Sequence, residues 1–201
     1  MRKPLHCLGV VLAGGKSSRM GKDKALLSVN GERLLDRSVT LLNKAGVDQT
    51  IISGNVHGEQ DKLECIGPLG GIYTALVKYQ PHALLIIPVD LPFIDLTTLQ
   101  HLKSAGQLSN KACFYQQHYL PLYLPNNHFC QRFFTKNIAT QTSLIPKNKT
   151  NTYSVRSMLN HLPHRELPIK NPHALFNANT PQDWQQVEGK LAKNRSYNVK
   201  F

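Results

Sequence analysis

Residues 12–27 combine glycines and cations in a way that suits the binding of phosphate. The segment reads Leu-Ala-Gly-Gly-Lys-Ser-Ser-Arg-Met-Gly-Lys-Asp-Lys-Ala-Leu-Leu, with three glycines and with cations at positions 16, 19, 22 and 24. Glycine lets the backbone approach a ligand closely, and successive N–H groups beside cations form a concave site for a polyanion. Because the apolar run 9–12 leads into this segment, we predict a phosphate loop at the carboxyl end of a first strand, where open α/β sheets bind their ligands.

Neither of the common phosphate loops fits this segment. A Walker A loop needs Gly-x4-Gly-Lys-Ser/Thr, but counting back from Gly21 places Lys16 at the first glycine position, and Asp23 fills the Ser/Thr position. A dinucleotide fingerprint needs Gly-x-Gly-x-x-Gly, which Gly14, Gly15 and Gly21 do not supply. The segment is therefore a phosphate loop of another kind, or a glycine-rich turn with solvated lysines.

Asp90 is a second candidate for chemistry. It follows the apolar run 84–87, so a strand would present its carboxylate at the strand's carboxyl end, and Pro88 and Pro92 stiffen the bend around it. A carboxylate beside a triphosphate suits the binding of Mg²⁺ together with phosphate oxygens. The alternative role for Asp90 is to cap the turn that follows.

Over its whole length, segment 12–27 resembles the signature of the sugar-phosphate-type nucleotidyltransferases, and most closely that of the molybdenum cofactor guanylyltransferases. That family's pattern is Leu-Ala-Gly-Gly, a few residues, Arg-Met-Gly, a short gap, and Asp-Lys before an apolar run. The corresponding parts here are residues 12–15, 19–21, 23–24 and 25–27. The resemblance implies transfer of GMP from GTP to molybdopterin, with direct attack on the α-phosphorus and release of pyrophosphate.

The resemblance also implies roles for particular residues. The family's Pro-x-Asp-x-Pro metal-binding segment matches residues 88–92, which makes Asp90 the ligand of Mg²⁺, the expected cofactor. The catalytic candidates are Arg19, Lys24 and Asp90. The nucleotide-binding candidates are Leu12, Ala13, Gly14, Gly15, Lys24, Asn55, Asp61, Gly70 and Asp90. The family's Asn-x-Asn-Thr-Pro segment matches residues 177–181, so the candidates for binding the second substrate are Asn177 and Asn179.

Several of these assignments have structural alternatives. The glycine-rich turn 67–71 is also a common way to start a helix. The family often has an asparagine that contacts the nucleotide near the end of the second strand. Either Asn55 serves as that contact or the contact is missing. The spacing of Asp61 from Gly67 matches the family only approximately. Thr180 before Pro181 also has the chemistry of a helix N-cap.

The composition is that of one globular domain. The chain has 201 residues, 18% of them charged and 41% hydrophobic, which is enough to bury a core and excludes general disorder. Four cysteines without Cys-x-x-Cys spacing (Cys7, Cys65, Cys113, Cys130) indicate reduced thiols in a cytoplasmic protein, not disulfides or a zinc site. The apolar run 8–13 is short for a signal peptide, and no segment approaches the roughly twenty apolar residues of a membrane span.

The net charge of +12 predicts anionic partners. These could be nucleic acid, or a nucleoside triphosphate with a phosphorylated second substrate. The cations are spread along the chain without an RNA-binding signature, so we expect small phosphorylated substrates, no nucleic acid and no membrane. The resemblance implies that these substrates are GTP and molybdopterin, with transient contacts to cofactor-handling proteins. The alternatives are a related nucleotidyltransferase that uses CTP or a sugar-phosphate acceptor and, more distantly, a non-enzymatic basic nucleic-acid-binding domain.

The elements that must position these residues follow from alternating apolar runs and helical patterns, which indicate βαβ units and a mostly parallel sheet. We expect strands at 6–12, 49–53, 83–87, 113–115, 119–124 and 174–177. We expect helices at 32–45, after 67–71, and at 96–104, 129–136, 154–162 and 181–192, with a mobile excursion over 139–152. The resemblance implies an α/β fold, a single-domain Rossmann-like three-layer sandwich. We expect the nucleotidyltransferase domain at 1–192 and a loose C-terminal tail at 193–201.

Overall fold

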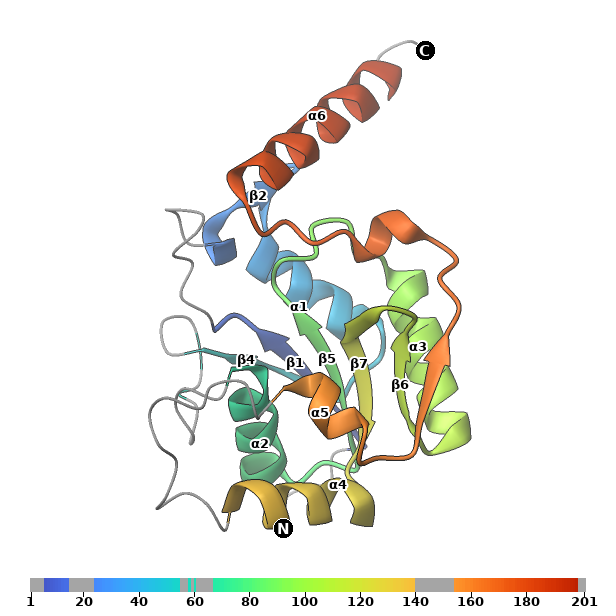
Figure 1. Ribbon diagram of the computed structural model, residues 1–201. Coiled ribbons are helices and arrows are strands. Elements are labelled where there is room, and N and C mark those ends of the chain that lie inside the picture. Colours follow the sequence, from blue (N-terminus) through green and yellow to red (C-terminus); the bar gives the residue numbers. More distant parts are fainter. Residues whose placement is uncertain are drawn as a thin grey trace.

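A computed structural model describes residues 6–14, 24–54, 58, 60, 67–139 and 154–198, with backbone alone for Lys24, 138–139 and 193–198. Within these residues the chain forms a six-stranded sheet with helices on both faces (Figure 1). The strand order is β4-β1-β5-β7-β6-β8, and β7 alone among the described strands runs antiparallel to its neighbours in this sheet. The predicted α/β sandwich with a mostly parallel sheet is therefore confirmed.

The central strands are apolar on both faces because helices cover both sides of the sheet. The strands of the sheet are β1 (Cys7–Leu12), β4 (Gln49–Ser53), β5 (Ala83–Pro88), β6 (Ala112–Tyr115), β7 (His118–Pro125) and β8 (His164–Leu167). Along β5, Leu84 and Ile86 contribute to one core while Leu85 and Ile87 contribute to the other. This alternation follows from the two-residue repeat of a strand.

Each face of the sheet packs against its own set of helices. One core includes side chains from α1 (Leu34–Lys44), α3 (Leu96–Ser109) and α6 (Pro181–Asn198). The other includes side chains from α2 (Pro68–Tyr79), α4 (His128–Phe134) and α5 (Val155–Leu159). The short helices are η1 (Lys24–Leu26), η2 (Thr135–Ala139) and η3 (Pro172–Leu175). No helix in the described part of the chain is long and apolar enough to span a membrane.

Most predicted elements are found, with shifted ends. The helix expected from residue 32 begins at Leu34, because β2 (Ser28–Val29) and β3 (Glu32–Arg33) form a hairpin before it. Asn30 and Gly31 both have positive φ in that turn, which is the geometry of a tight Asn-Gly hairpin. α3 continues past residue 104 to Ser109, and the left-handed conformation of Asn110 ends it.

The strand expected at 174–177 is wrong. Pro172–Leu175 forms η3, because Pro172 presets a helical φ and the Asn171 side chain accepts a hydrogen bond from the His173 N–H (3.2 Å). The sheet is completed instead by β8, which pairs in parallel with β6. Three of its four residues are exposed, so β8 has little of the apolar pattern that predicts a strand.

Two further predictions stay predictions. The excursion expected over 139–152 falls almost entirely outside the described residues. α6 reaches Asn198, and the loose tail proposed for 193–201 is not tested by the described side chains.

The cysteines that the structure describes, Cys7, Cys113 and Cys130, are buried and free, whereas Cys65 lies outside the described residues.

Candidate active site

The two segments singled out by sequence leave the sheet at the same edge. Leu12 at the end of β1 is paired with Ser53 of β4 and with Pro88 of β5. Beyond the pairing, the Ala13 N–H donates to the Ser53 carbonyl (2.8 Å) and the Val89 N–H donates to the Leu12 carbonyl (3.1 Å). We call this the carboxyl edge of the sheet. The start of the predicted phosphate loop and the bend that contains Asp90 therefore lie side by side.

Close backbone packing shapes the start of the loop. Gly54, directly after β4, has a φ of +148°, and a Cβ atom there would lie 2.8 Å from the Gly14 nitrogen. Glycine is thus the residue that this position accepts. Leu12 is buried, Ala13 is half-buried and Gly14 is exposed, so the chain emerges from the core into solvent as the loop begins.

The amino terminus of α2 packs against the same edge. A Cβ atom at Gly71 would clash with Ser53 Oγ and would lie 3.1 Å from Leu12 Cδ2. The Gly70 N–H donates to the Gly67 carbonyl (3.0 Å), and the Gly70 carbonyl accepts from Thr74 Oγ1 (2.8 Å). The expected helix start is confirmed. It also brings the positive end of a helix dipole to the carboxyl edge, where an anion would be stabilised.

Contacts from α1 and from the segment before α6 hold the Asp90 turn, which we define as residues 88–94. The Asp90 carbonyl accepts from the Ala178 N–H (3.0 Å), and the Ile94 carbonyl accepts from the Arg37 guanidinium of α1 (3.1 Å). The Asp90 residue is half-buried. α3, which follows the turn, is capped by Asp95, whose carboxylate accepts from the Thr98 N–H (2.7 Å). Asp90 is thus not the cap of that helix.

Asn177 and Asn179 are brought beside the Asp90 turn because Ala178 lies between them. Both asparagines are exposed, whereas Ala178 is buried. The N-cap role of Thr180 is confirmed: Thr180 Oγ1 accepts from the Asp183 N–H (3.1 Å), and Asp183 accepts in return from the Thr180 N–H (2.8 Å) and the Asn179 N–H (2.9 Å). This capping box holds the segment where α6 begins.

An aromatic pair extends this contact between the Asp90 turn and the chain before α6. The rings of Phe93 and Phe176 lie 6.2 Å apart between centroids. The Lys190 ammonium of α6 lies 5.6 Å from the Phe93 centroid and 5.0 Å from the Phe176 centroid, within cation–π range. Sequence reasoning missed Arg37 and Lys190, because a charged residue in a helical pattern predicts only a solvent-exposed face.

The structure leaves some predicted residues untested. Gly15, Arg19, Asn55 and Asp61 lie outside the described residues, and only the backbone of Lys24 is described, at the start of η1. Among the described residues no group of three or more His, Cys, Asp or Glu side chains could hold a metal ion. A single carboxylate such as that of Asp90 is compatible with a divalent ion, because Mg²⁺ commonly binds through one or two carboxylates together with substrate phosphates.

Comparisons with known proteins agree with this arrangement. The chain is 31% identical over 185 residues to the molybdenum cofactor guanylyltransferase of Xanthomonas euvesicatoria pv. vesicatoria, which covers 89% of this chain and 93% of that protein. It is 30% identical to the probable molybdenum cofactor guanylyltransferase of Pelotomaculum thermopropionicum, over 97% of this chain and 98% of that protein.

The fold has a solved counterpart. The crystal structure of molybdopterin-guanine dinucleotide biosynthesis protein A from Archaeoglobus fulgidus matches with a TM-score of 0.70 at 20% identity, over 92% of this chain and 99% of that one. The family model for the MobA-like NTP transferase domain matches residues 9–164. The chain therefore belongs to the family of MobA-like NTP transferase domains.

Proposed function

We propose that this protein is a molybdenum cofactor guanylyltransferase, which transfers GMP from GTP to molybdopterin. The observation that carries the proposal is the meeting of the segment after β1 with the Asp90 turn at the carboxyl edge of the sheet. A phosphate loop and a carboxylate side by side suit phosphoryl-transfer chemistry. Relatives that bear this name, 30–31% identical over most of the chain, support the choice of substrates.

In this proposal GTP lies over the loop that follows β1. The backbone of residues 12–15, with Arg19 and Lys24, neutralises the triphosphate, and Asn55, Asp61 and Gly70 contribute to nucleotide binding. Asp90 holds Mg²⁺, which would stabilise negative charge on the α-phosphate and the leaving pyrophosphate. The dipole of α2, whose amino terminus packs on the same edge, adds to that stabilisation.

The second substrate approaches from the side of Asn177 and Asn179. These exposed amides can donate hydrogen bonds to an anionic or carbonyl-bearing molecule, and the Ala178–Asp90 hydrogen bond keeps them beside the turn. An oxygen of the molybdopterin phosphate attacks the α-phosphorus of GTP. A new P–O bond forms as the bond to the β-phosphate oxygen breaks, and pyrophosphate leaves. Positioning of two anions is the main task of the protein.

We further propose that the enzyme works in the cytoplasm, with transient contacts to proteins that deliver or receive the cofactor. The free thiols of the described cysteines support the cellular location. The charge of +12 supports the binding of two phosphorylated substrates.

A product assay with matched variants tests the function. The protein is incubated with Mg²⁺, molybdopterin and either GTP or CTP, and the product is identified by mass. We expect the GMP adduct with GTP and none with CTP. Asp90→Ala should lower the rate on the order of a hundredfold or more, since the metal and its charge stabilisation are lost.

Asp95→Asn is the control for the loss of a nearby carboxylate. Asparagine caps a helix about as well as aspartate, but its amide nitrogen replaces the oxygen that accepts from Asn171 Nδ2 (2.9 Å). This variant should therefore keep its activity, at a small cost in stability from the loss of one exposed hydrogen bond. A CMP adduct as the main product would contradict the choice of nucleotide. Full activity of Asp90→Ala in Mg²⁺ would contradict the role of Asp90.

A further inference from the structure

The chain that leads into α6 runs along the Asp90 turn in the opposite direction. We call residues 176–180 the acceptor segment, because it carries the two asparagines proposed to bind the second substrate. Its Phe176 lies against Phe93 of the turn, and its Ala178 is bonded to Asp90, which comes earlier in the turn. Figure 1 shows this part of the chain crossing the turn between β5 and α3 before α6 begins. The proposed metal ligand and the proposed acceptor contacts therefore belong to two segments in direct contact.

One of these contacts is a backbone hydrogen bond. The Ala178 N–H donates to the Asp90 carbonyl over 3.0 Å, and Ala178 is buried. A single hydrogen bond fixes the distance between two segments at one point, but their relative orientation needs a second contact. The aromatic pair lies where that second contact is required.

Lys190 of α6 contacts both rings of the aromatic pair. Its ammonium lies 5.0 Å from the centroid of Phe176 and 5.6 Å from that of Phe93. Both distances are within the cation–π range of about 6 Å. Lys190 Nζ also lies 3.3 Å from Nδ1 of His173 in η3. One side chain therefore connects α6 with the Asp90 turn, with the acceptor segment and with η3.

The three side chains of this contact are partly shielded from water. Phe93, Phe176 and Lys190 are each half-buried, and both rings pack against the core that includes α1, α3 and α6. A cation–π contact becomes stronger as water is removed from around it. Lys190 should therefore hold the two rings more firmly than an exposed lysine would.

We propose that Lys190 is a positioning residue of the transfer reaction, which holds the acceptor segment against the Asp90 turn. This role rests on the proposed function, in which Asp90 holds the metal and the acceptor segment binds the second substrate. Lys190 acts through the two rings. Direct attack requires two substrates in close and aligned positions. The contact should therefore affect the rate of transfer more than the affinity for GTP, which the loop after β1 binds.

Hydrogen exchange of two backbone amides, followed by NMR, tests this role without any substrate. The Ala178 N–H donates across the contact, whereas the Ala13 N–H donates to the Ser53 carbonyl (2.8 Å) and serves as the reference. In Lys190→Ala the Ala178 amide should exchange about tenfold faster, the size expected when two cation–π contacts are lost together. The Ala13 amide should keep its native rate, because local opening leaves distant hydrogen bonds closed.

Steady-state kinetics of the same variant separate the rate of transfer from nucleotide binding. With saturating substrates and Mg²⁺, Lys190→Ala should lower kcat about tenfold through misalignment of the reacting groups, with the KM for GTP unchanged. Alanine is a strong helix former, so the variant should fold. Lys190→Arg should restore both the native exchange rates and the native kcat, because a guanidinium also makes cation–π contacts.

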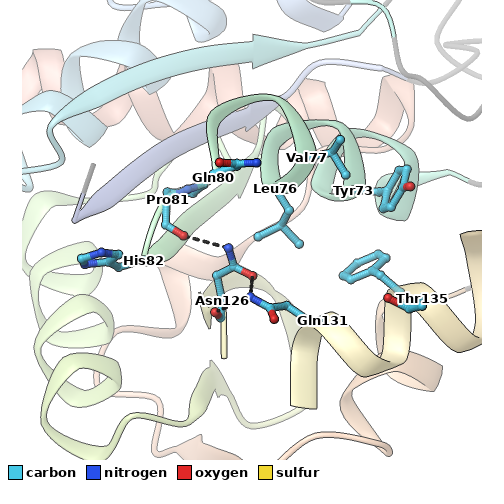
Figure 2. A pocket seen from close by; sticks show the side chains of 10 residues that line it. Tyr73, Leu76, Val77, Gln80, Pro81, His82, Asn126, Gln131 and Thr135 are labelled. Atoms are coloured by element: carbon cyan, nitrogen blue, oxygen red, sulfur yellow. Dashed lines mark hydrogen bonds between the residues drawn. The ribbon is translucent and has the colours of Figure 1, made fainter. Parts of the chain in front are cut away.

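Lys78→Ala is the matched control for the loss of a cation–π contact. The Lys78 ammonium lies 5.6 Å from the centroid of Tyr79, the next residue of α2, so this contact does not join two segments. That half of α2 borders a cavity of about 520 Å³ beside α4 and the connection into β5 (Figure 2). β5 begins at Ala83, directly after His82 of the cavity wall, so the control lies at the opposite edge of the sheet from the active site. Both exchange rates and kcat should stay native in Lys78→Ala.

Several outcomes would overturn the proposed role of Lys190. These are a native exchange rate of the Ala178 amide in Lys190→Ala, equal acceleration of the Ala13 amide, a native kcat in Lys190→Ala, and the same losses in Lys190→Arg or Lys78→Ala. If the native protein transferred no GMP, the proposed function would fail. The exchange rates would still decide whether Lys190 holds the two segments together, so the two failures are distinguishable.

Discussion

The carbonyl oxygen of Asp90 accepts a hydrogen bond from Ala178, and Ile94 in the same turn accepts one from Arg37 of α1. The position of the Asp90 carboxylate therefore depends on residues far from it in sequence. The residue types were predictable, because a carboxylate after an apolar run and a glycine-rich loop both have recognisable chemistry. The hydrogen bonds that hold the Asp90 turn were not predictable. A single arginine in a helix does not indicate which distant carbonyl it will contact.

A prediction at this scale concerns Gly54. In Gly54→Ala the new Cβ atom would lie 2.8 Å from the Gly14 nitrogen, on a backbone with a φ of +148°. We expect a loss of about 1–3 kcal/mol in the free energy of unfolding from strain and crowding, together with a raised KM for GTP because the start of the phosphate loop is displaced. Urea denaturation and steady-state kinetics measure the two effects.

Gly31→Ala is the matched control. Gly31 also has a positive φ, of +85°, but nothing lies within 4 Å of its would-be Cβ atom. It should show the backbone strain alone, a smaller loss of stability and an unchanged KM for GTP. Equal effects in the two variants would contradict the role given to the Gly54–Gly14 contact.

At the scale of elements, a reciprocal cap holds α6 and the segment before it. Thr180 and Asp183 exchange hydrogen bonds, and Asp183 also accepts from the Asn179 N–H. The sequence predicted both the cap and the helix, because Thr180 before Pro181 has the chemistry of a helix N-cap. The element that precedes them was mispredicted as a strand, since local apolar content cannot decide whether a neighbouring strand is available for pairing.

Removal of the cap should therefore affect the second substrate selectively. Thr180→Ala should lower the free energy of unfolding by about 1 kcal/mol and raise the KM for molybdopterin, with the KM for GTP unchanged, because it loosens the segment that carries Asn177 and Asn179. Asn127→Ala removes the cap of α4, where the side chain accepts from the Cys130 N–H (3.2 Å), at a similar cost in stability. If Asn127→Ala raised the KM for molybdopterin as much, the effect would be one of general stability.

At the scale of the whole molecule, the two cores on either side of the sheet enclose cysteine thiols and tyrosine hydroxyls whose pKa values are raised. Burial raises the pKa of the Cys7 thiol to about 11 and that of Cys130 to about 12, from 9.0. Burial likewise raises the pKa values of Tyr115 and Tyr123 to about 12, from 10.0. Cys7, Tyr115 and Tyr123 belong to one core and Cys130 to the other, so both cores carry such groups.

The free energy of unfolding should consequently fall in alkaline solution. Above about pH 9 an unfolded thiol loses its proton while the folded thiol keeps it, so the unfolded state binds fewer protons and stability falls with rising pH. Each such group contributes at most about 1.4 kcal/mol per pH unit within its window. Urea denaturation from neutral pH to about pH 11 measures the slope.

Cys130→Ala tests whether the buried thiol causes this slope. The variant is less stable at neutral pH because it leaves a cavity, but its stability should fall less steeply between about pH 9 and pH 11 than that of the native protein. An identical slope in the two proteins would show that other groups are responsible.

The residue types and their order along the chain predict the chemistry and its approximate place. Parallel strands end at a common edge, so a phosphate loop after one strand and Asp90 after another had to lie near that edge. Two features emerge only from the folded chain: β7 lies antiparallel between β5 and β6, and β8 completes the sheet. These features depend on contacts between residues distant in sequence, such as Arg37 with Ile94 and Asp90 with Ala178. Local patterns of polarity predict which face of an element is buried, but they do not specify which distant residue it will contact.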